Sequence, residues 1–232
     1  MISIIIPTYN EGKYLSKLLE SLKQQTFQDF EIIVSDNDSK DKTKQIAKKY
    51  GCKIVKGGIP AVARNNGAKI ANGDLLFVDA DVIIKANNLI ETFLTEIKAE
   101  KLDCASLKIT PDSNNFSAKF YYFIKNYLNK LFGYIKGNAS GQFLFVKKIF
   151  FDKVGGYDGS LILGEEHDLV HRLKGKGAKF HFFMDLSVTN SARRVEKEGL
   201  IKLLVKNAYS EIIRFFGFKI TKKLFDYEFG KY

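Results

Sequence analysis

The sequence has no tryptophan, two cysteines and three prolines, and it lacks any long apolar run. Cys52 and Cys104 stand far apart with no ligand-like spacing, which excludes a disulfide-stapled scaffold and a cysteine-rich metal module and favours a reducing cytoplasm. Because no stretch of about 18 apolar residues occurs, we expect no membrane-spanning helix. The apolar N-terminus is interrupted by Pro7 and polar residues, so we interpret it as a strand and not as a targeting segment.

Positive charge exceeds negative charge: 37 Lys and Arg face 26 Asp and Glu, a net charge of +11. Such an excess predicts an anionic partner, which could be nucleic acid, a membrane surface or a phosphorylated substrate. No nucleic-acid-binding motif is present and the basic residues are not gathered in one block, so we expect no nucleic-acid partner.

Apolar strand patterns alternate with amphipathic helix patterns as far as about residue 110, which predicts a mostly parallel sheet in an α/β fold. A chain of 232 residues can bury a core as a single domain. We expect strands near 2–6, 31–36, 52–56 and 74–79, with helices near 12–25, 41–50, 61–71 and 86–100. A loop at 110–115, a long helix, a strand near 142–147 and a helix over 165–175 should follow.

Two carboxylates, Asp79 and Asp81, follow the strand predicted at 74–79. In open α/β sheets ligands bind at the carboxyl ends of strands. Paired carboxylates suit Mg²⁺ or Mn²⁺, which complete their coordination shell with water and phosphate oxygens. Arg64, upstream, offers a planar guanidinium to a phosphate. The alternatives are a solvated acidic loop for the aspartates and a surface ion pair for Arg64.

Several further motifs occur in a fixed order around this pair. They are Ile5-Ile6-Pro7-Thr8-Tyr9-Asn10-Glu11, Glu31-Ile32-Ile33-Val34-Ser35-Asp36, Ala63-Arg64-Asn65-Asn66-Gly67, Val154-Gly155-Gly156-Tyr157-Asp158 and Gly164-Glu165-Glu166-His167-Asp168. Over roughly residues 2 to 195 this order resembles family 2 of the inverting, nucleotide-sugar-dependent glycosyltransferases. The resemblance implies the GT-A fold, a Rossmann-like and mostly parallel sheet flanked by helices, with amphipathic helices in the second half. It also implies a nucleotide-sugar-binding half at 1–110 and an acceptor-binding half at 111–198, before a basic amphipathic segment at 199–232.

The resemblance assigns a donor site and its metal. Asp79 and Asp81 would hold Mg²⁺ or Mn²⁺, and Arg64 would contact the diphosphate of a UDP- or GDP-type sugar. Arg193 and Arg194 could close over the diphosphate, although a solvent-facing arginine pair is the alternative. The residues that would line the base and ribose are Pro7, Thr8, Tyr9, Glu11 and Asp36. The alternative for these is a strand-to-helix turn with capping side chains.

The catalytic base is expected in the acidic motif, because transfer to a hydroxyl needs a proton acceptor. Members of the family usually have Glu-Asp there, and Glu166 stands at the position of that aspartate. Asp168 is the competing base, His167 a neighbouring contact, and a helix-capping acidic turn is the non-catalytic alternative. The absence of tryptophan excludes the Gln-x-x-Arg-Trp motif of processive cellulose-type synthases.

Two segments, 116–136 and 199–223, combine an apolar and aromatic face with lysines and arginines. This pattern fits a helix lying on an anionic membrane surface and also an ordinary core helix with a charged back. We favour the membrane, and with it attachment to the cytoplasmic face.

The predicted reaction moves a sugar to an acceptor hydroxyl on a lipid-linked or cell-envelope glycan. One alternative is a polyprenyl-phosphate glycosyltransferase, whose anionic acceptor needs no base. Another is a non-catalytic nucleotide-sugar-binding protein.

Overall fold

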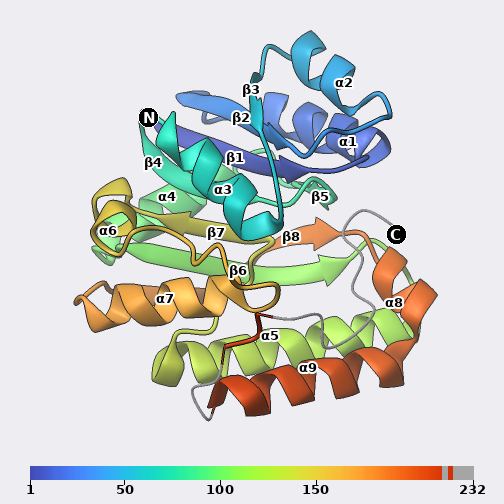
Figure 1. Cartoon of the computed structure of the whole chain (residues 1–232), viewed down its shortest axis with the longest axis vertical. Coiled ribbons are helices and arrows are strands. Elements are labelled where there is room, and N and C mark those ends of the chain that lie inside the picture. Colours follow the sequence, from blue (N-terminus) through green and yellow to red (C-terminus); the bar gives the residue numbers. More distant parts are fainter. Residues whose placement is uncertain (216–218, 222–232) are drawn as a thin grey trace.

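The computed structural model describes residues 1–215 and 219–221 (Figure 1). Much of the C-terminal segment predicted at 199–232, including Lys222 and Lys223, therefore lies outside the described residues. The strands are β1 (Ile2–Thr8), β2 (Phe30–Asp36), β3 (Lys53–Lys56), β4 (Asp74–Val78), β5 (Val82–Ile83), β6 (Cys104–Pro111), β7 (Phe143–Val146) and β8 (Phe180–Asn190). The helices are α1 (Gly12–Lys23), α2 (Thr43–Lys49), α3 (Pro60–Lys69), α4 (Leu89–Ala99), α5 (Phe116–Lys136), α6 (Lys148–Lys153), α7 (Glu165–Gly175), α8 (Arg193–Glu198) and α9 (Leu200–Phe215).

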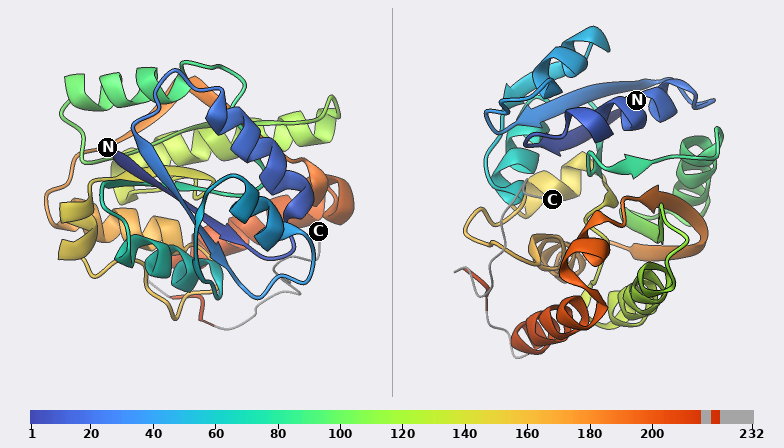
Figure 2. Two further views of the ribbon diagram at one scale, coloured as in Figure 1. Left: turned by 90° about the horizontal axis from the view of Figure 1, so that it is seen from above. Right: turned by 90° about the vertical axis from the view of Figure 1, so that its right-hand side faces the viewer.

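These strands form one sheet in the order β3-β2-β1-β4-β7-β6-β8-β5. The first four strands in sequence run parallel, β7 is antiparallel to both β4 and β6, and β6 is parallel to β8. Helices cover both faces of the sheet (Figures 1 and 2). The early strands and helices predicted from the sequence are confirmed within a few residues.

Apolar side chains of β1 alternate between the two faces of the sheet, as the strand repeat requires. Ile4 and Ile6 belong to the core cluster that includes Leu15 of α1 and Phe93 of α4. Ile5 belongs to a second cluster, with Phe77 of β4 and residues of α6 and α7. Because both faces are buried, β1 reads as a continuous apolar run and not as an alternating one.

Strands β5 and β6 were not predicted from the sequence, and the mid-chain loop expected at 110–115 begins two residues later. Thr110 and Pro111 were predicted to open that loop, yet they are the last residues of β6 and lie opposite Thr189 and Asn190 of β8. A proline is tolerated at a strand end because its missing N–H then interrupts little of the ladder. The loop begins at Asp112.

Gly67 brings α3 unusually close to the sheet. A Cβ at this position would lie 2.5 Å from Cγ2 of Ile5 and 2.9 Å from Oγ of Ser35. Only glycine therefore fits at this contact between α3, β1 and β2.

Helix α5 is delimited by its own sequence. Asn115 caps the N-terminus, its side chain accepting a hydrogen bond from the Ser117 N–H at 2.8 Å, and Gly137 ends the helix with φ of 86°. Asn126 fixes the helix on the sheet: its Oδ1 accepts from Ile109 N at 3.0 Å and its Nδ2 donates to Ile109 O at 2.8 Å.

The apolar stripe of α5 is on its outer face and not in the core. The side chains packed inward include Ala118, Tyr121, Tyr122 and Asn126. Six large apolar residues spaced three or four apart are exposed by 41–76%: Phe116, Phe120, Phe123, Tyr127, Leu131 and Ile135. Ile201, Val205, Tyr209 and Ile212 of α9 are exposed by 45–78%. The two helices lie side by side at one end of the molecule (Figures 1 and 2), so we name these ten residues the α5–α9 apolar face.

Candidate active site

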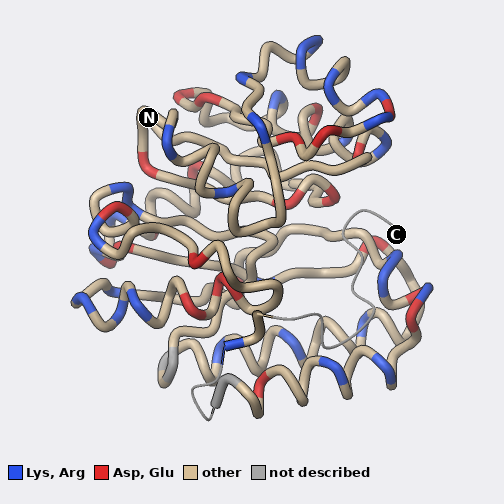
Figure 3. The backbone as a smooth tube through the Cα atoms, viewed as in Figure 1, with Lys and Arg blue, Asp and Glu red and all other residues tan. Residues whose placement is uncertain are grey.

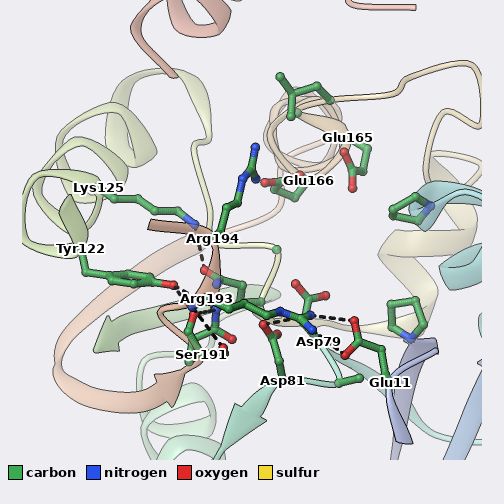
Figure 4. A pocket seen from close by; sticks show the side chains of 18 of the residues that line it. Glu11, Asp79, Asp81, Tyr122, Lys125, Glu165, Glu166, Ser191, Arg193 and Arg194 are labelled. Atoms are coloured by element: carbon green, nitrogen blue, oxygen red, sulfur yellow. Dashed lines mark hydrogen bonds and ion pairs between the residues drawn. The ribbon is translucent and has the colours of Figure 1, made fainter. Parts of the chain in front are cut away.

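A pocket of about 210 Å³ opens where β1 and β4 end, between these strands and the start of α7 (Figure 4). Segments far apart in the sequence meet there, including the start of α3, one side of α5 and the turn between β8 and α8. The predicted site residues that line it are Pro7, Glu11, Arg64, Asp79, Asp81, Glu166, Arg193 and Arg194.

Arg64 connects the two halves of the pocket. Its Nη2 donates to Oδ1 of Asp79 at 2.8 Å, and its Nη1 donates to Oε1 of Glu165 at 2.8 Å. The side chain is only 4% exposed. Burial lowers the pKa of the Arg64 guanidinium, but the surrounding carboxylates outweigh this effect and hold the pKa well above its usual value. Arg64 is therefore a permanent cation at the back of the pocket.

Arg193 reaches across the pocket to two acidic residues. Its guanidinium forms a two-point contact with Glu11, at 2.7 and 3.0 Å, and Nη2 lies 3.4 Å from Oδ2 of Asp81. The guanidinium also lies over the ring of Tyr14, 4.5 Å from its centroid. Burial raises the pKa of Asp81 to about 7, with Arg193 opposing the shift and Asp79 and Glu11 adding to it. The carboxylates of Glu11, Asp79 and Asp81 therefore lie close to one another and to the guanidinium groups of Arg64 and Arg193.

The start of α7 presents two consecutive glutamates. Gly164 enters the helix with φ of 77°, a left-handed conformation that suits glycine. Glu165 is buried against Arg64, and burial raises its pKa to about 7, helped by the neighbouring Glu166. Glu166 lines the pocket opposite Gly141, whose absent side chain leaves room: a Cβ there would lie 3.1 Å from Cδ of Glu166.

Four predicted site residues do not line the pocket: Thr8, Tyr9, Asp36 and Asp168. Asp168 instead pairs with Arg172, one turn along α7, at 2.7–2.8 Å. Thr8 Oγ1 donates to Asp36 at 3.0 Å, and Asp36 also accepts from the N–H and hydroxyl of Ser39. Asp36 therefore organises the turn after β2, but it does not cap α2, whose N-cap residue is Lys42.

The donor set at Asp79 and Asp81 fits a hard divalent cation. Both carboxylates line the pocket, one residue apart. Among residues 1–215 and 219–221, no group of three or more His, Cys, Asp and Glu side chains could hold a metal ion. Mg²⁺ and Mn²⁺ commonly bind one or two carboxylates together with substrate phosphates, and this pair could serve in that way.

A polar group on the far side of the pocket was not predicted from the sequence. Tyr122 and Lys125 project from α5, and Lys125 Nζ donates to Oε1 of Gln142 at 2.8 Å. With the Asn190 amide turned so that its nitrogen faces Asp81, that nitrogen donates to Asp81 Oδ1 at 2.9 Å. Its oxygen then accepts from Gln142 Nε2 at 2.5 Å. Tyr122 and Lys125 are three residues apart, so they share one side of α5, away from the apolar stripe.

Solved structures with a similar fold include glycosyltransferases. TarS residues 1–349 from Staphylococcus aureus, solved with UDP, superposes with a TM-score of 0.64 at 22% identity, covering 82% of this chain and 60% of that one. The mannosyltransferase PcManGT from Pyrobaculum calidifontis, solved with GDP-Man and Mn²⁺, gives a TM-score of 0.66 at 16% identity, covering 82% and 56%. The architecture is the GT-A fold, as expected.

Proteins similar to this chain in sequence are also glycosyltransferases. The glycosyltransferase GlyG of Streptococcus pneumoniae is 28% identical over 211 residues, which are 80% of this chain and 68% of GlyG. TarS, a poly(ribitol-phosphate) β-N-acetylglucosaminyltransferase, is 41% identical over 98 residues, 38% of this chain but 17% of its own length. The chain thus spans only part of these relatives. The family model for glycosyl transferase family 2 matches residues 3–154, and the chain belongs to that family.

Proposed function

We propose that the protein transfers a sugar, with inversion, from a nucleoside-diphosphate sugar of the UDP or GDP type to an acceptor hydroxyl. The observation that carries this proposal is the pocket in which Asp79 and Asp81 face the glutamates of α7. The acceptor we infer is a cell-envelope or lipid-linked glycan, in keeping with the poly(ribitol-phosphate) named for TarS. The halves 1–110 and 111–198 would bind donor and acceptor, respectively.

In this mechanism each residue has a distinct task. Arg64 positions the diphosphate, and Arg193 exchanges its contacts with Glu11 and Asp81 for contacts with the leaving phosphate. Asp79 and Asp81 would hold Mg²⁺ or Mn²⁺, which neutralises the charge of the leaving group when bound. Glu166 accepts the proton of the acceptor hydroxyl, and its place in the pocket favours it over Asp168.

Donor binding can be tested without knowing the acceptor. Saturation with the correct nucleotide sugar and Mn²⁺ at about 100 times Kd should stabilise the fold by about 2.7 kcal/mol, raising Tm by roughly 5–10 °C. We expect this rise with at least one of UDP-GlcNAc, UDP-glucose and GDP-mannose in a thermal-shift measurement. If none of them changes Tm, with or without Mn²⁺, the proposed donor site is wrong.

The second part of the proposal concerns the anionic membrane surface as a partner. The α5–α9 apolar face is exposed, which supports a docking role for its residues over a core-packing one. Exposed Lys119, Lys130 and Lys202 lie on the same helices, and Figure 3 shows basic residues along both. Anionic lipid attracts such lysines by about 1 kcal/mol each, and shallow insertion of Phe and Leu adds apolar burial. No helix in the described part of the chain is long and apolar enough to cross a bilayer.

Sedimentation with vesicles tests this partner. At low salt the protein should pellet with vesicles rich in phosphatidylglycerol and be released by salt, as expected of a protein that binds an anionic membrane surface peripherally. The double change Phe123→Ser and Leu131→Ser should weaken binding at least about tenfold, because two apolar side chains lose their burial. Ile149→Ser is the matched control, since Ile149 is 74% exposed on α6, outside this face. Protein that stays in the supernatant, or that instead self-associates through this face, would contradict membrane docking.

A further inference from the structure

Lys125 differs from the arginines of the pocket in its partners. Arg64, Arg193 and Arg194 each pair with a carboxylate, at 2.7–3.0 Å. Within residues 1–215 and 219–221, Lys125 Nζ contacts only neutral groups: Oε1 of Gln142 at 2.8 Å and the ring of Tyr122, 6.0 Å from its centroid. An ammonium has three donors, and one is used here. Lys125 therefore brings uncompensated charge and two open donors to the pocket.

The position of this ammonium is well defined. Asn126, the next residue, ties α5 to the backbone of Ile109 in β6 through two hydrogen bonds. Gln142, which accepts from Lys125, is itself held by Asn190. Such a supported contact is typical of a binding residue and not of a solvated lysine, since immobilising a free lysine costs side-chain entropy.

Lys125 lies on the acceptor side of the pocket. Figure 4 shows Lys125 and Tyr122 on one side, and Asp79 and Glu11 on the other, with Arg193 and Arg194 between them. Because Arg64 and Arg193 are adjacent to the aspartates, they are placed to serve a donor diphosphate. A cation across the pocket from them suits a second anion.

We propose that Lys125 binds a phosphate group of the acceptor substrate, so that the acceptor is an anionic molecule. This inference rests on the proposed function of the same pocket and adds the chemical class of its second substrate. The phosphate could belong to a prenyl monophosphate lipid or to a phosphodiester-linked glycan. In a phosphodiester-linked glycan Lys125 holds the phosphate while a nearby hydroxyl attacks the sugar and Glu166 takes its proton. In a prenyl monophosphate the phosphate held by Lys125 itself supplies the attacking oxygen, and no base is needed.

Calorimetric titration of methyl phosphate into protein saturated with UDP and Mg²⁺ tests the site without turnover. Lys125→Met should weaken methyl phosphate binding at least about tenfold, as expected for a lost charge-assisted hydrogen bond. Lys98→Met is the control, because Lys98 is exposed on α4, outside the pocket and outside the α5–α9 apolar face; its affinity should equal that of the wild type. Geranyl phosphate and bis(glycerol) phosphate then distinguish the two sources: the one that binds more tightly, and loses more affinity in Lys125→Met, names the acceptor.

The results separate this inference from the proposed function. Wild-type protein that fails to bind UDP would contradict the proposed function itself. If UDP binds but Lys125→Met takes up methyl phosphate as well as the wild type, only the acceptor site is wrong. If Lys125→Met weakens UDP and methyl phosphate by the same factor, Lys125 serves the donor and the inference is overturned.

Discussion

Glu166→Gln is expected to lower turnover by about 10²–10⁴ while donor affinity stays close to that of the wild type. The substitution keeps the size of the side chain and removes its ability to accept a proton. Glu166 lines the pocket at the start of α7, on the side away from Asp79 and Asp81, where an acceptor hydroxyl would approach (Figure 4). Release of UDP or GDP from the donor, followed alongside donor affinity, measures the two effects separately.

A matched substitution on the same helix decides between the two possible bases. Asp168 pairs with Arg172 and is not among the residues that line the pocket, so Asp168→Asn should cost stability more than turnover. Should Asp168→Asn abolish turnover while Glu166→Gln remains near normal, the base has been assigned to the wrong carboxylate. Equal turnover with both variants, and transfer to a phosphate acceptor, would indicate that no base is needed.

Asp81→Asn is expected to weaken metal-dependent donor binding on the order of 100-fold, and chelation of the wild type should do the same. We expect Asp81→Asn not to lower the stability of the fold. Burial raises the pKa of Asp81 to about 7, above its value in an unfolded chain, so the charged form costs stability as pH rises from about 4 to 7. At pH 8 an uncharged asparagine removes that cost, and Tm should be equal to or above that of the wild type.

Titration of UDP in the presence of Mn²⁺, together with a thermal melt, checks both expectations on the same sample. Asn66→Ala is a suitable control because Asn66, half-buried in the last turn of α3, does not line the pocket, and its side chain bonds to Lys56 O and to Lys69. Full activity in excess chelator would refute the metal assignment. A lowered Tm in Asp81→Asn would show that Asp81 is needed for folding and would make its binding defect uninformative about the metal.

The sequence predicted the first half of the fold well because each of its strands is a short apolar run that ends in polar residues. Asp79 and Asp81 could be placed at a strand end for the same reason. The antiparallel strand β7 was foreseen, but β6 was not, since its pattern continues directly into the polar stretch after Pro111. Local patterns carry no information about which distant segments share a sheet edge.

The candidate site was predictable in so far as its residues belong to short motifs. Tyr122 and Lys125 escaped notice because they lie in a helix whose other face carries the apolar pattern. The pairing of Arg64 with Glu165, 101 residues away, could not be inferred either. Contacts of this kind depend on which strands become neighbours in the sheet. Helical periodicity showed that α5 has an apolar face, but it did not show whether that face packs in the core or is exposed.

Gly67 explains why glycine follows Arg64 in the Arg-Asn-x-Gly motif: it lets α3 pack closely against the sheet. Residues 64 and 67 are three apart, so they lie on the same side of α3 and about one turn from each other. The absent side chain of Gly67 sets how deeply α3 settles on β1, and the depth of α3 sets how far the Arg64 guanidinium extends between Asp79 and Glu165. The absence of a side chain at Gly67 thus determines the distance between α3 and β1. A larger residue would overlap Ile5 and Ser35, so α3 or its neighbours would have to shift. We therefore expect a change at Gly67 to displace the Arg64 guanidinium and to alter the candidate site from a distance.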